Sequence, residues 1–221
     1  MKISDNPFKS QDFGLPDNAF VYCCFNEPIK IDPLIFETWM KILHKTPDSV
    51  LWLSKGQEPA VKNLRQAAID HGINSERLIF AERLPHSQFL KRNQLADLFL
   101  DTYYYNAGAT AVAAASSGIP ILTCPHDSFT SRMGASICAA LELKQMICKD
   151  LEEYENKAVD FYYNPDKLKV IKETLINNHD SLPLFNTKQF IKNLENLLIQ
   201  MYSIYNDGQK PRSIKIDEIK F

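Results

Sequence analysis

Residues 98–123 decide the fold of this chain and read LFLDTYYYNAGATAVAAASSGIPILT. The apolar segment 98–100 is typical of a short buried strand, and the segment 119–123 is typical of a second one. Between them lies a loop with a small-residue tip, followed by a helix of small side chains over 111–118. A strand, a helix and a second strand of these lengths predict a βαβ unit with parallel strands.

The start of the small-residue helix is a candidate anion site. Gly108 and Ala109 let the backbone N–H groups of the first turn approach a ligand closely, and Thr110 adds a hydroxyl. Free N–H groups and the helix dipole favour a bound phosphate. The alternative is that the small residues serve only close packing of the helix on the sheet. The loop matches neither the GxGxxG nor the Walker pattern, so both interpretations stay open.

Outward from this unit, the chain repeats the alternation of strand and helix. Buried strands are expected at 19–25, 50–53 and 78–80, followed by helices at 33–45, 59–71 and 87–94. From residue 127 onward the pattern turns helical, with helices expected at 131–141, 151–162, 165–177 and 186–205 and a short apolar segment at 146–148. The pattern predicts an α/β fold: a doubly wound, Rossmann-like parallel sheet with extra C-terminal helices.

The domain organisation expected is one lobe over 13–205, between an N-terminal lead of 1–12 and a polar C-terminal tail of 206–221. The last helix carries an apolar stripe made up of Phe190, Leu194, Leu197, Leu198 and Met201. We interpret this stripe as part of the core. The alternative is a structural protein that packs this helix on a partner.

Composition excludes several classes of protein. The 221 residues are 45% apolar with a net charge of −2, which argues against binding to nucleic acid or to an anionic membrane. No apolar run is long enough to cross a bilayer, and the N-terminus has no signal-peptide core. The five cysteines form no CxxC pair and the histidines show no metal spacing, so we expect buried thiols, no metal and a cytoplasmic location.

Candidate binding residues lie in the loops that follow the strands, because open parallel sheets bind ligands at that edge. Lys30, after the first strand, could meet a phosphate, or it could be a solvated surface lysine. His86, Phe89 and Arg92 share one helix face, where a ring and a guanidinium could stack on a flat base. In the alternative reading Phe89 is core, Arg92 its solvated neighbour and His86 a cap.

The loop after the strand at 119–123 places His126 next to Asp127. Adjacent side chains seldom face one another, so this pair is a weak candidate for catalysis. No serine or cysteine with an ordered base suggests a nucleophile.

Several blocks of sequence, in a fixed order, resemble one family. They are Phe13-Gly14-Leu15-Pro16, Val21-Tyr22-Cys23, Phe25-Asn26, Lys30-Ile31-Asp32-Pro33, 49–53, 94–97, Leu100-Asp101-Thr102, Gly118-Ile119-Pro120, Ser131-Arg132, Ala135-Ser136 and Pro183-Leu184-Phe185-Asn186-Thr187-Lys188-Gln189. The chain from Phe13 to about Tyr205 is similar to the carboxyl-terminal lobe of O-GlcNAc transferases and SPINDLY-like glycosyltransferases, glycosyltransferase family 41.

The resemblance implies a GT-B enzyme whose lobe seen here binds a UDP-sugar and needs no metal. The enzyme would transfer N-acetylglucosamine, or another hexose, to Ser or Thr of proteins. Lys30 resembles the lysine that stabilises the departing diphosphate. Arg92 matches an arginine beside the uracil, Leu84 would offer backbone contacts to that base, and residues 108–110 fall on the phosphate loop.

Some positions depart from the family pattern. The family often has glutamine at Glu27, a lysine at His86, histidines at Phe89 and Gly108, and a ribose-binding aspartate at Ala113. The alternative function is therefore a degenerate, non-catalytic module that binds a nucleotide or a protein. The resemblance also implies two partners that this lobe lacks, an amino-terminal catalytic lobe and a protein acceptor, so we expect the isolated lobe to be inactive.

Overall fold

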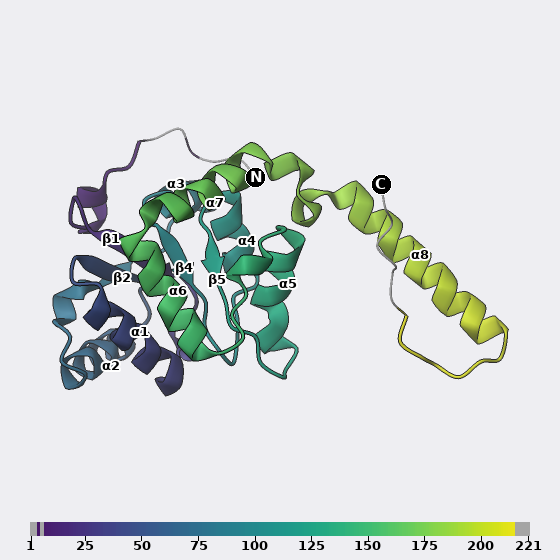
Figure 1. Ribbon diagram of the computed structural model, residues 1–221, viewed down its shortest axis with the longest axis horizontal. Coiled ribbons are helices and arrows are strands. Elements are labelled where there is room, and N and C mark those ends of the chain that lie inside the picture. Colours follow the sequence, from purple (N-terminus) through teal and green to yellow (C-terminus); the bar gives the residue numbers. More distant parts are fainter. Residues whose placement is uncertain (1–3, 5–6, 215–221) are drawn as a thin grey trace. The chain divides into compact units, whose positions relative to one another are not determined.

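Five parallel strands form the sheet of this protein in the computed structural model, which describes residues 4 and 7–214 (Figure 1). The strands lie in the order β3-β2-β1-β4-β5. Their bounds are Phe20–Cys24 (β1), Ser49–Ser54 (β2), Leu78–Ala81 (β3), Leu98–Leu100 (β4) and Ile121–Leu122 (β5). The order confirms the doubly wound sheet that the alternation of elements predicts.

The first strand is the centre of the sheet. It pairs with β2, where Phe20 lies opposite Ser49, and with β4, where Tyr22 lies opposite Leu98. Almost every residue of β1, β2 and β4 is buried, as expected for parallel strands covered on both faces. The chain reverses its direction of winding between β1 and β4, and parallel sheets of this kind form a crevice at that point.

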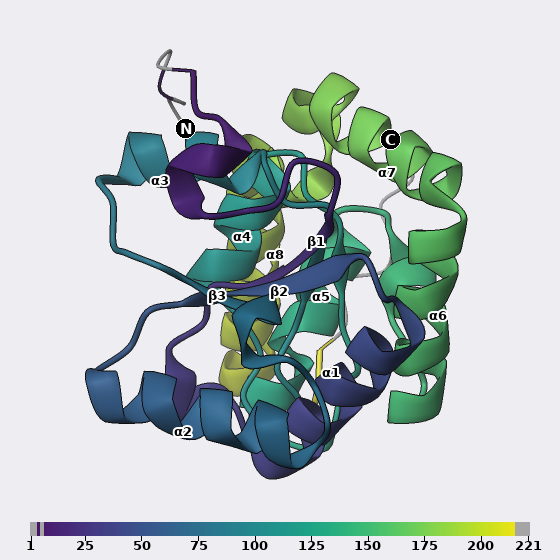
Figure 2. The same ribbon diagram turned by 90° about the vertical axis from the view of Figure 1, so that its left-hand side faces the viewer.

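Helices cover both faces of the sheet. On one side lie α1 (Pro33–Lys45) and α6 (Leu151–Tyr163), which pack against each other; on the other lie α3 (His86–Asn93) and α4 (Ala109–Ser116) (Figure 2). Three further helices precede His179: α2 (Glu58–Asp70), α5 (Met133–Ala140) and α7 (Pro165–Asn177).

Local sequence explains where the helices begin. The Asp32 carboxylate caps α1 by accepting hydrogen bonds from the N–H groups of Leu34 (3.0 Å) and Ile35 (3.1 Å). Pro33 follows at the first helical position, where its missing N–H is not needed. The 3₁₀ turn η2 (Pro28–Lys30) precedes α1 and replaces the plain loop that we expected there.

The core lies between the sheet and its helices and contains Trp39, Trp52, Tyr22, Tyr154 and Phe99, all fully buried. The Tyr154 hydroxyl of α6 donates a hydrogen bond of 3.0 Å to the backbone oxygen of Asp101, at the end of β4. It also accepts one from the Trp39 indole N–H (3.3 Å) of α1. Burying the Tyr154 hydroxyl and the Trp39 indole N–H is tolerable because each has a partner, whereas the buried Trp52 indole N–H has none among the described residues.

Most element bounds lie within one residue of the sequence prediction, and the larger differences are in β5, α4 and α5. The last strand is shorter than 119–123, and Thr123 instead forms an isolated bridge with Ile147. The small-residue helix begins at Ala109, because Gly108 serves as its N-cap. The helix expected at 131–141 is a 3₁₀ turn, η4 (Thr130–Arg132), followed by α5.

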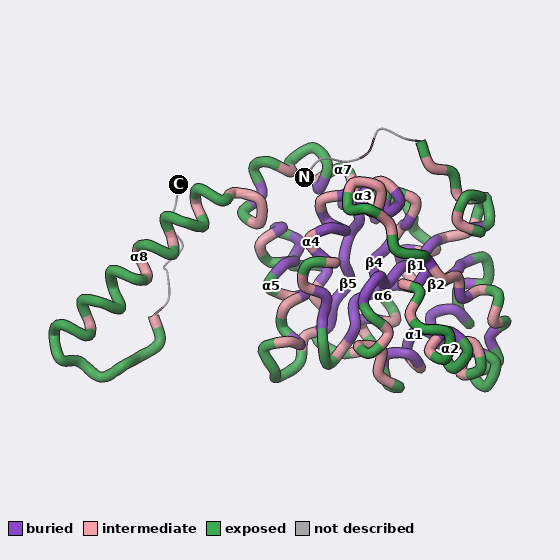
Figure 3. The backbone as a smooth tube through the Cα atoms, turned by 180° about the vertical axis from the view of Figure 1, so that it is seen from behind, coloured by how far each residue is buried: buried purple, intermediate pink, exposed green. Residues whose placement is uncertain are grey.

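The chain divides into two compact units, the first ending at His179 and the second beginning at Asp180. The second unit contains α8 (Thr187–Asn206), all of whose residues the structure describes. None of them is buried, as the exposed and intermediate colours of α8 in Figure 3 show. The apolar stripe of this helix is therefore not buried within the second unit, whereas we expected it to belong to the core. Part of the expected C-terminal tail, residues 215–221, lies outside the described residues.

Candidate functional site

A hollow of about 340 Å³ opens at the carboxyl ends of β1 and β4, where the winding of the sheet reverses. Its walls come from the loop after β1, from the loop between β4 and α4, and from the segment around η4. The lining residues are Phe25, Asn26, Glu27, Lys30, Tyr105, Asn106, Gly108, Ala109, Thr110, Phe129, Thr130 and Met133. Five of the nine residues expected at the site lie here together: Glu27, Lys30, Gly108, Ala109 and Thr110.

Lys30 supplies a positive charge to this hollow. Its ammonium donates a hydrogen bond of 3.1 Å to the backbone oxygen of Asn106 and lies 3.9 Å from the centre of the Tyr105 ring. Both partners belong to the loop before α4, so the lysine bridges the ends of β1 and β4. An ammonium group has three donors, and a single hydrogen bond to a neutral oxygen leaves the others for an anion.

The first turn of α4 faces the same hollow. No side chain caps this helix at Gly108, and Ala109 is too small to cover the backbone. The first N–H groups of a helix have no partner within it and carry the positive end of its dipole. The Thr110 hydroxyl donates a hydrogen bond of 2.6 Å to the Asn26 side chain, which fixes the helix start against the end of β1.

Buried polar side chains hold the loop between β4 and α4 in place. The Asn26 amide donates to the Thr102 hydroxyl (2.9 Å), which in turn donates to the backbone oxygen of Tyr105 (2.5 Å). The Asn106 amide donates to the backbone oxygen of Thr102, and its own oxygen accepts from the N–H of Gly134 (3.2 Å). The lining of the hollow is therefore fixed by hydrogen bonds within the loop and by bonds to Asn26 and Gly134, which are far from it in sequence.

Glu27 adds a negative charge to the lining, and a partner compensates it. Its carboxylate pairs with the Arg83 guanidinium from the loop after β3. Both side chains are more than half exposed, so the pair is screened by solvent. The carboxylate is thus directed toward a cation of the protein.

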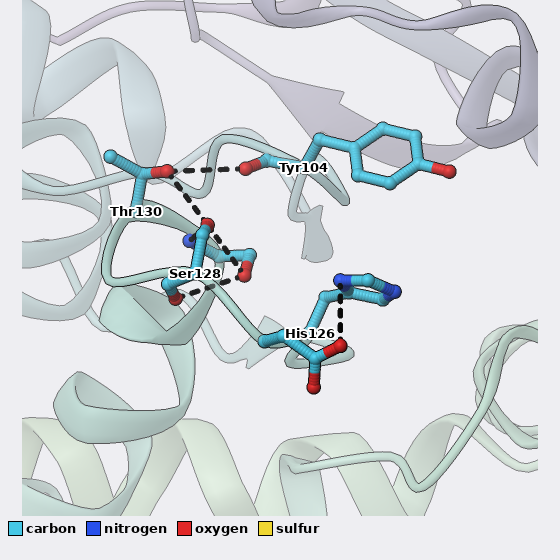
Figure 4. Close-up of polar contacts among 6 residues, drawn as sticks. Tyr104, His126, Ser128 and Thr130 are labelled. Atoms are coloured by element: carbon cyan, nitrogen blue, oxygen red, sulfur yellow. Dashed lines mark hydrogen bonds and ion pairs between the residues drawn. The ribbon is translucent and has the colours of Figure 1, made fainter.

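The His126–Asp127 pair belongs to the loop after β5 and does not line the hollow. The His126 Nδ1 atom lies 3.9 Å from Asp127 Oδ2, and the His126 ring contacts the ring of Tyr104 (Figure 4). The ring of Tyr103 contacts the His126 ring as well. Farther along this loop the Thr130 hydroxyl donates to the backbone oxygen of Tyr104 (3.3 Å). The loop contributes Phe129 and Thr130 to the site rather than a catalytic pair.

Metal ligands do not gather anywhere in the described residues, where no group of three His, Cys, Asp or Glu side chains could hold an ion. The five cysteines are all buried free thiols. Burial raises the pKa of Cys124 to about 11, so this thiol is protonated at neutral pH. Among the described residues, none of the helices is long and apolar enough to cross a bilayer.

Residues 8–194 match the family described as glycosyl transferase family 41. The chain belongs to glycosyl transferase family 41. It is 35% identical over 211 residues to an Arabidopsis thaliana protein named "Probable UDP-N-acetylglucosamine--peptide N-acetylglucosaminyltransferase SEC", covering 95% of this chain and 22% of that protein. It is 33% identical over 196 residues to a UDP-N-acetylglucosamine--peptide N-acetylglucosaminyltransferase of Caenorhabditis elegans, covering 89% of this chain and 17% of that one. The chain therefore spans about a fifth of the length of these family 41 relatives.

The fold agrees with a family 41 lobe. A mutant O-GlcNAc transferase of Thermobaculum terrenum superposes with a TM-score of 0.79 at 25% identity, over 84% of this chain and 36% of that one. The five-stranded parallel sheet with helices on both faces resembles one lobe of a GT-B glycosyltransferase.

Four residues expected from the family 41 resemblance lie outside the lining of the hollow. Arg92 is only 3% exposed, and its Nη1 donates to the backbone oxygen of Glu82 (2.6 Å). Burial lowers the pKa of Arg92 to about 10, so the guanidinium stays charged at neutral pH. It lies over the rings of Phe25 (4.7 Å) and Phe89 (5.1 Å). Phe25 also lines the hollow, so its contacts with Arg92 and Phe89 connect the hollow with α3.

The other two expected residues lie near α3. Leu84 is half-buried in the segment between β3 and α3, and His86 is exposed at the first residue of α3. Neither lines the hollow around Lys30. Their roles beside a nucleotide base stay predictions.

Proposed function

We propose that this chain is the donor-binding lobe of a glycosyltransferase that moves N-acetylglucosamine, or another hexose, from UDP to serine or threonine hydroxyls of proteins. Membership of family 41 and the printed names of its relatives support this assignment. The single observation that carries it is the hollow itself, in which Lys30 and the open first turn of α4 converge.

The chemistry of sugar transfer explains why such a hollow is useful. When the bond between the sugar and the diphosphate breaks, negative charge develops on the leaving oxygen. A fixed ammonium and backbone N–H groups in a partly dry site stabilise that charge in the transition state. Lys30 supplies the ammonium, and residues 109 and 110 supply N–H groups, so no metal is needed for this step.

We place the nucleoside end of the donor toward α3. The Phe25 ring contacts Phe89 at 5.8 Å between ring centres, and both contact the Arg92 guanidinium. Such a group of rings and one cation suits a flat base. We therefore place uridine between the hollow and α3, with Leu84 and His86 beside it.

Binding of UDP tests the proposal. Calorimetric titration of the full chain with UDP should give saturable binding, and Lys30→Ala should weaken it roughly tenfold to a hundredfold, because a charge-assisted hydrogen bond is lost. Lys169→Ala is the matched control, since this exposed lysine lies on α7 and not in the hollow. No binding at millimolar UDP, or equal loss in both variants, would count against the assignment.

A degenerate module is the second candidate. Ala113, where the resemblance implies a ribose-binding aspartate, is buried on α4 and presents no acceptor. If the chain belongs to an active transferase, we expect sugar transfer to require an amino-terminal lobe and a protein acceptor. If the chain binds UDP but never supports transfer when combined with such a lobe, the degenerate module is the correct reading.

A further inference from the structure

The carboxyl group of Asp101, only 1% exposed, lies within the loop that joins β4 to α4. Its Oδ1 accepts hydrogen bonds from the N–H groups of Thr102 (2.9 Å) and Ala107 (2.7 Å). Its Oδ2 accepts one from the Thr123 hydroxyl (2.8 Å) at the end of β5. One buried carboxyl therefore ties both ends of the segment 102–107 together and anchors them to the neighbouring strand.

The segment 102–107 carries part of the proposed donor site. Tyr105 and Asn106 line the hollow, and the segment leads directly into Gly108 and the first turn of α4. The Lys30 ammonium is held by the backbone oxygen of Asn106. A substitution of Asp101 should therefore alter the positions of the loop, the start of α4 and the Lys30 ammonium, although Asp101 itself does not line the hollow.

The surroundings of Asp101 make its ionisation sensitive to added charge. Burial raises the pKa of Asp101 to about 7, while its hydrogen bonds and the positive charge of Lys30 oppose that rise. The other titratable groups packed nearby are Cys24 of β1, Cys138 of α5 and Tyr154 of α6. Burial raises the pKa of each, so they are neutral near pH 7, and Lys30 is the charged side chain that acts on Asp101.

We propose that Asp101 is a positioning residue of the donor site and that the donor diphosphate binds together with a proton on Asp101. This rests on the proposed function. A diphosphate bound to Lys30 neutralises the positive charge that stabilises the Asp101 carboxylate, and it adds negative charge close to that group. Both effects raise the pKa of Asp101, so the carboxylate takes up a proton from solvent. The neutral group keeps its geometry: Oδ1 still accepts two N–H bonds, and the protonated Oδ2 donates to the Thr123 hydroxyl.

Because donor binding is coupled to protonation of Asp101, the affinity for the donor depends on pH. Below pH 7 Asp101 is already protonated in the free protein, so binding costs no proton uptake. Above pH 7 the proton must be acquired first, and affinity falls. A one-unit rise in the pKa on binding corresponds to about a fivefold loss of affinity between pH 6 and pH 8, and to about tenfold over the full titration.

Calorimetry on the full chain tests this with UDP-N-acetylglucosamine, whose phosphates do not titrate near neutral pH. We expect the wild type to lose about fivefold in affinity from pH 6 to pH 8 and to take up protons on binding, which is measured in buffers of different ionisation enthalpy. Asp101→Asn should bind tightly at both pH values with no proton uptake. Asp101→Ala should bind weakly at both. Asp97→Asn is the control, because Asp97 caps the N–H of Val21 (2.9 Å) at the opposite end of β4.

The outcomes separate the two proposals. A wild type that binds with no pH step, or an Asp101→Asn variant that keeps the step, overturns the proton linkage. Equal affinity of Asp101→Ala and Asp101→Asn overturns the positioning role. Should Asp101→Ala fail to fold, Thr123→Val removes only the Oδ2 partner and should move the step to higher pH; an unmoved step contradicts the inference. A wild type that binds at no pH refutes the proposed function instead.

Discussion

Glu27 places a carboxylate on the wall of a hollow in which we propose that a diphosphate binds. Two like charges in one small site repel each other, so the carboxylate needs a partner. Arg83, from the loop after β3, provides it. The pair is exposed and adds little to stability, but it removes net negative charge from the site.

Removal of Arg83 should therefore weaken donor binding although Arg83 does not line the hollow. We expect Arg83→Ala to lower the affinity for UDP by roughly two- to fivefold at low salt, because the Glu27 carboxylate is left without its partner. The effect is small because solvent screens this exposed charge. The double variant Arg83→Ala with Glu27→Gln should restore the affinity, because no carboxylate is left to repel the ligand. Titration of the three proteins at two salt concentrations measures this, and a double variant as weak as Arg83→Ala would refute it.

The individual residues of the site could be predicted only where they are close in sequence to the end of a strand. Lys30 comes within a few residues of the end of β1, and residues 108–110 form the N-cap and start of α4 after β4, so the sequence correctly indicates the edge of the sheet at which they lie. The partners that fix them were missed: Asn26 meets Thr102 across 76 positions and Thr110 across 84. Short polar side chains of this kind have no sequence signature of burial. Arg92 was placed on the correct helix, but its enclosure by aromatic rings depends on packing between α3 and β1.

The helices and strands themselves followed from local signals. Buried strands read as continuous apolar runs, and Asp32-Pro33 marks the start of α1, which begins as predicted. The ends that differ depend on contacts outside the element. The last strand stops at Leu122 because the Thr123 hydroxyl turns to Asp101 and its backbone pairs with residues 146–148. No local pattern reports such contacts.

The start of α5 packs unusually close to β4 and β5 through Gly134. A Cβ added at this position would overlap the Asp101 Oδ2 atom and the Thr123 hydroxyl, both of which are buried. The N–H of Gly134 also donates to the Asn106 side chain (3.2 Å). The helix thus needs glycine here for close approach, although alanine has the better helix propensity.

Gly134→Ala should destabilise the protein by roughly 1–3 kcal/mol, because overpacking a buried site outweighs the better helix propensity of alanine. Thermal unfolding measures this as a fall in Tm of several degrees. Ser136→Ala is the control on the same helix, since Ser136 is exposed and its replacement should change the free energy of unfolding by less than about 0.5 kcal/mol. A Gly134→Ala protein as stable as the wild type would show that α5 can move away from Asp101.

The molecule as a whole divides at His179, which the sequence does not mark with a linker. The lobe expected over 13–205 covers both units. All the strands and every residue that lines the hollow belong to the first unit. The second unit contains α8, whose exposed apolar residues include Phe190, Leu198 and Tyr205. Amphipathic spacing alone could not tell a helix of the core from one without buried residues, because both have the same periodicity.

A chain that ends at His179 should therefore keep the donor site. Its sheet, the hydrogen bonds around Asp101 and the lining of the hollow are all retained, so we expect cooperative unfolding and an affinity for UDP within about twofold of that of the full chain. Calorimetric titration and thermal unfolding of the two chains measure this, and adding Lys30→Ala to the shorter chain checks that the same site is used. A more than fivefold loss of affinity in the shorter chain would mean that residues after His179 contribute to donor binding, and the site would then need both units.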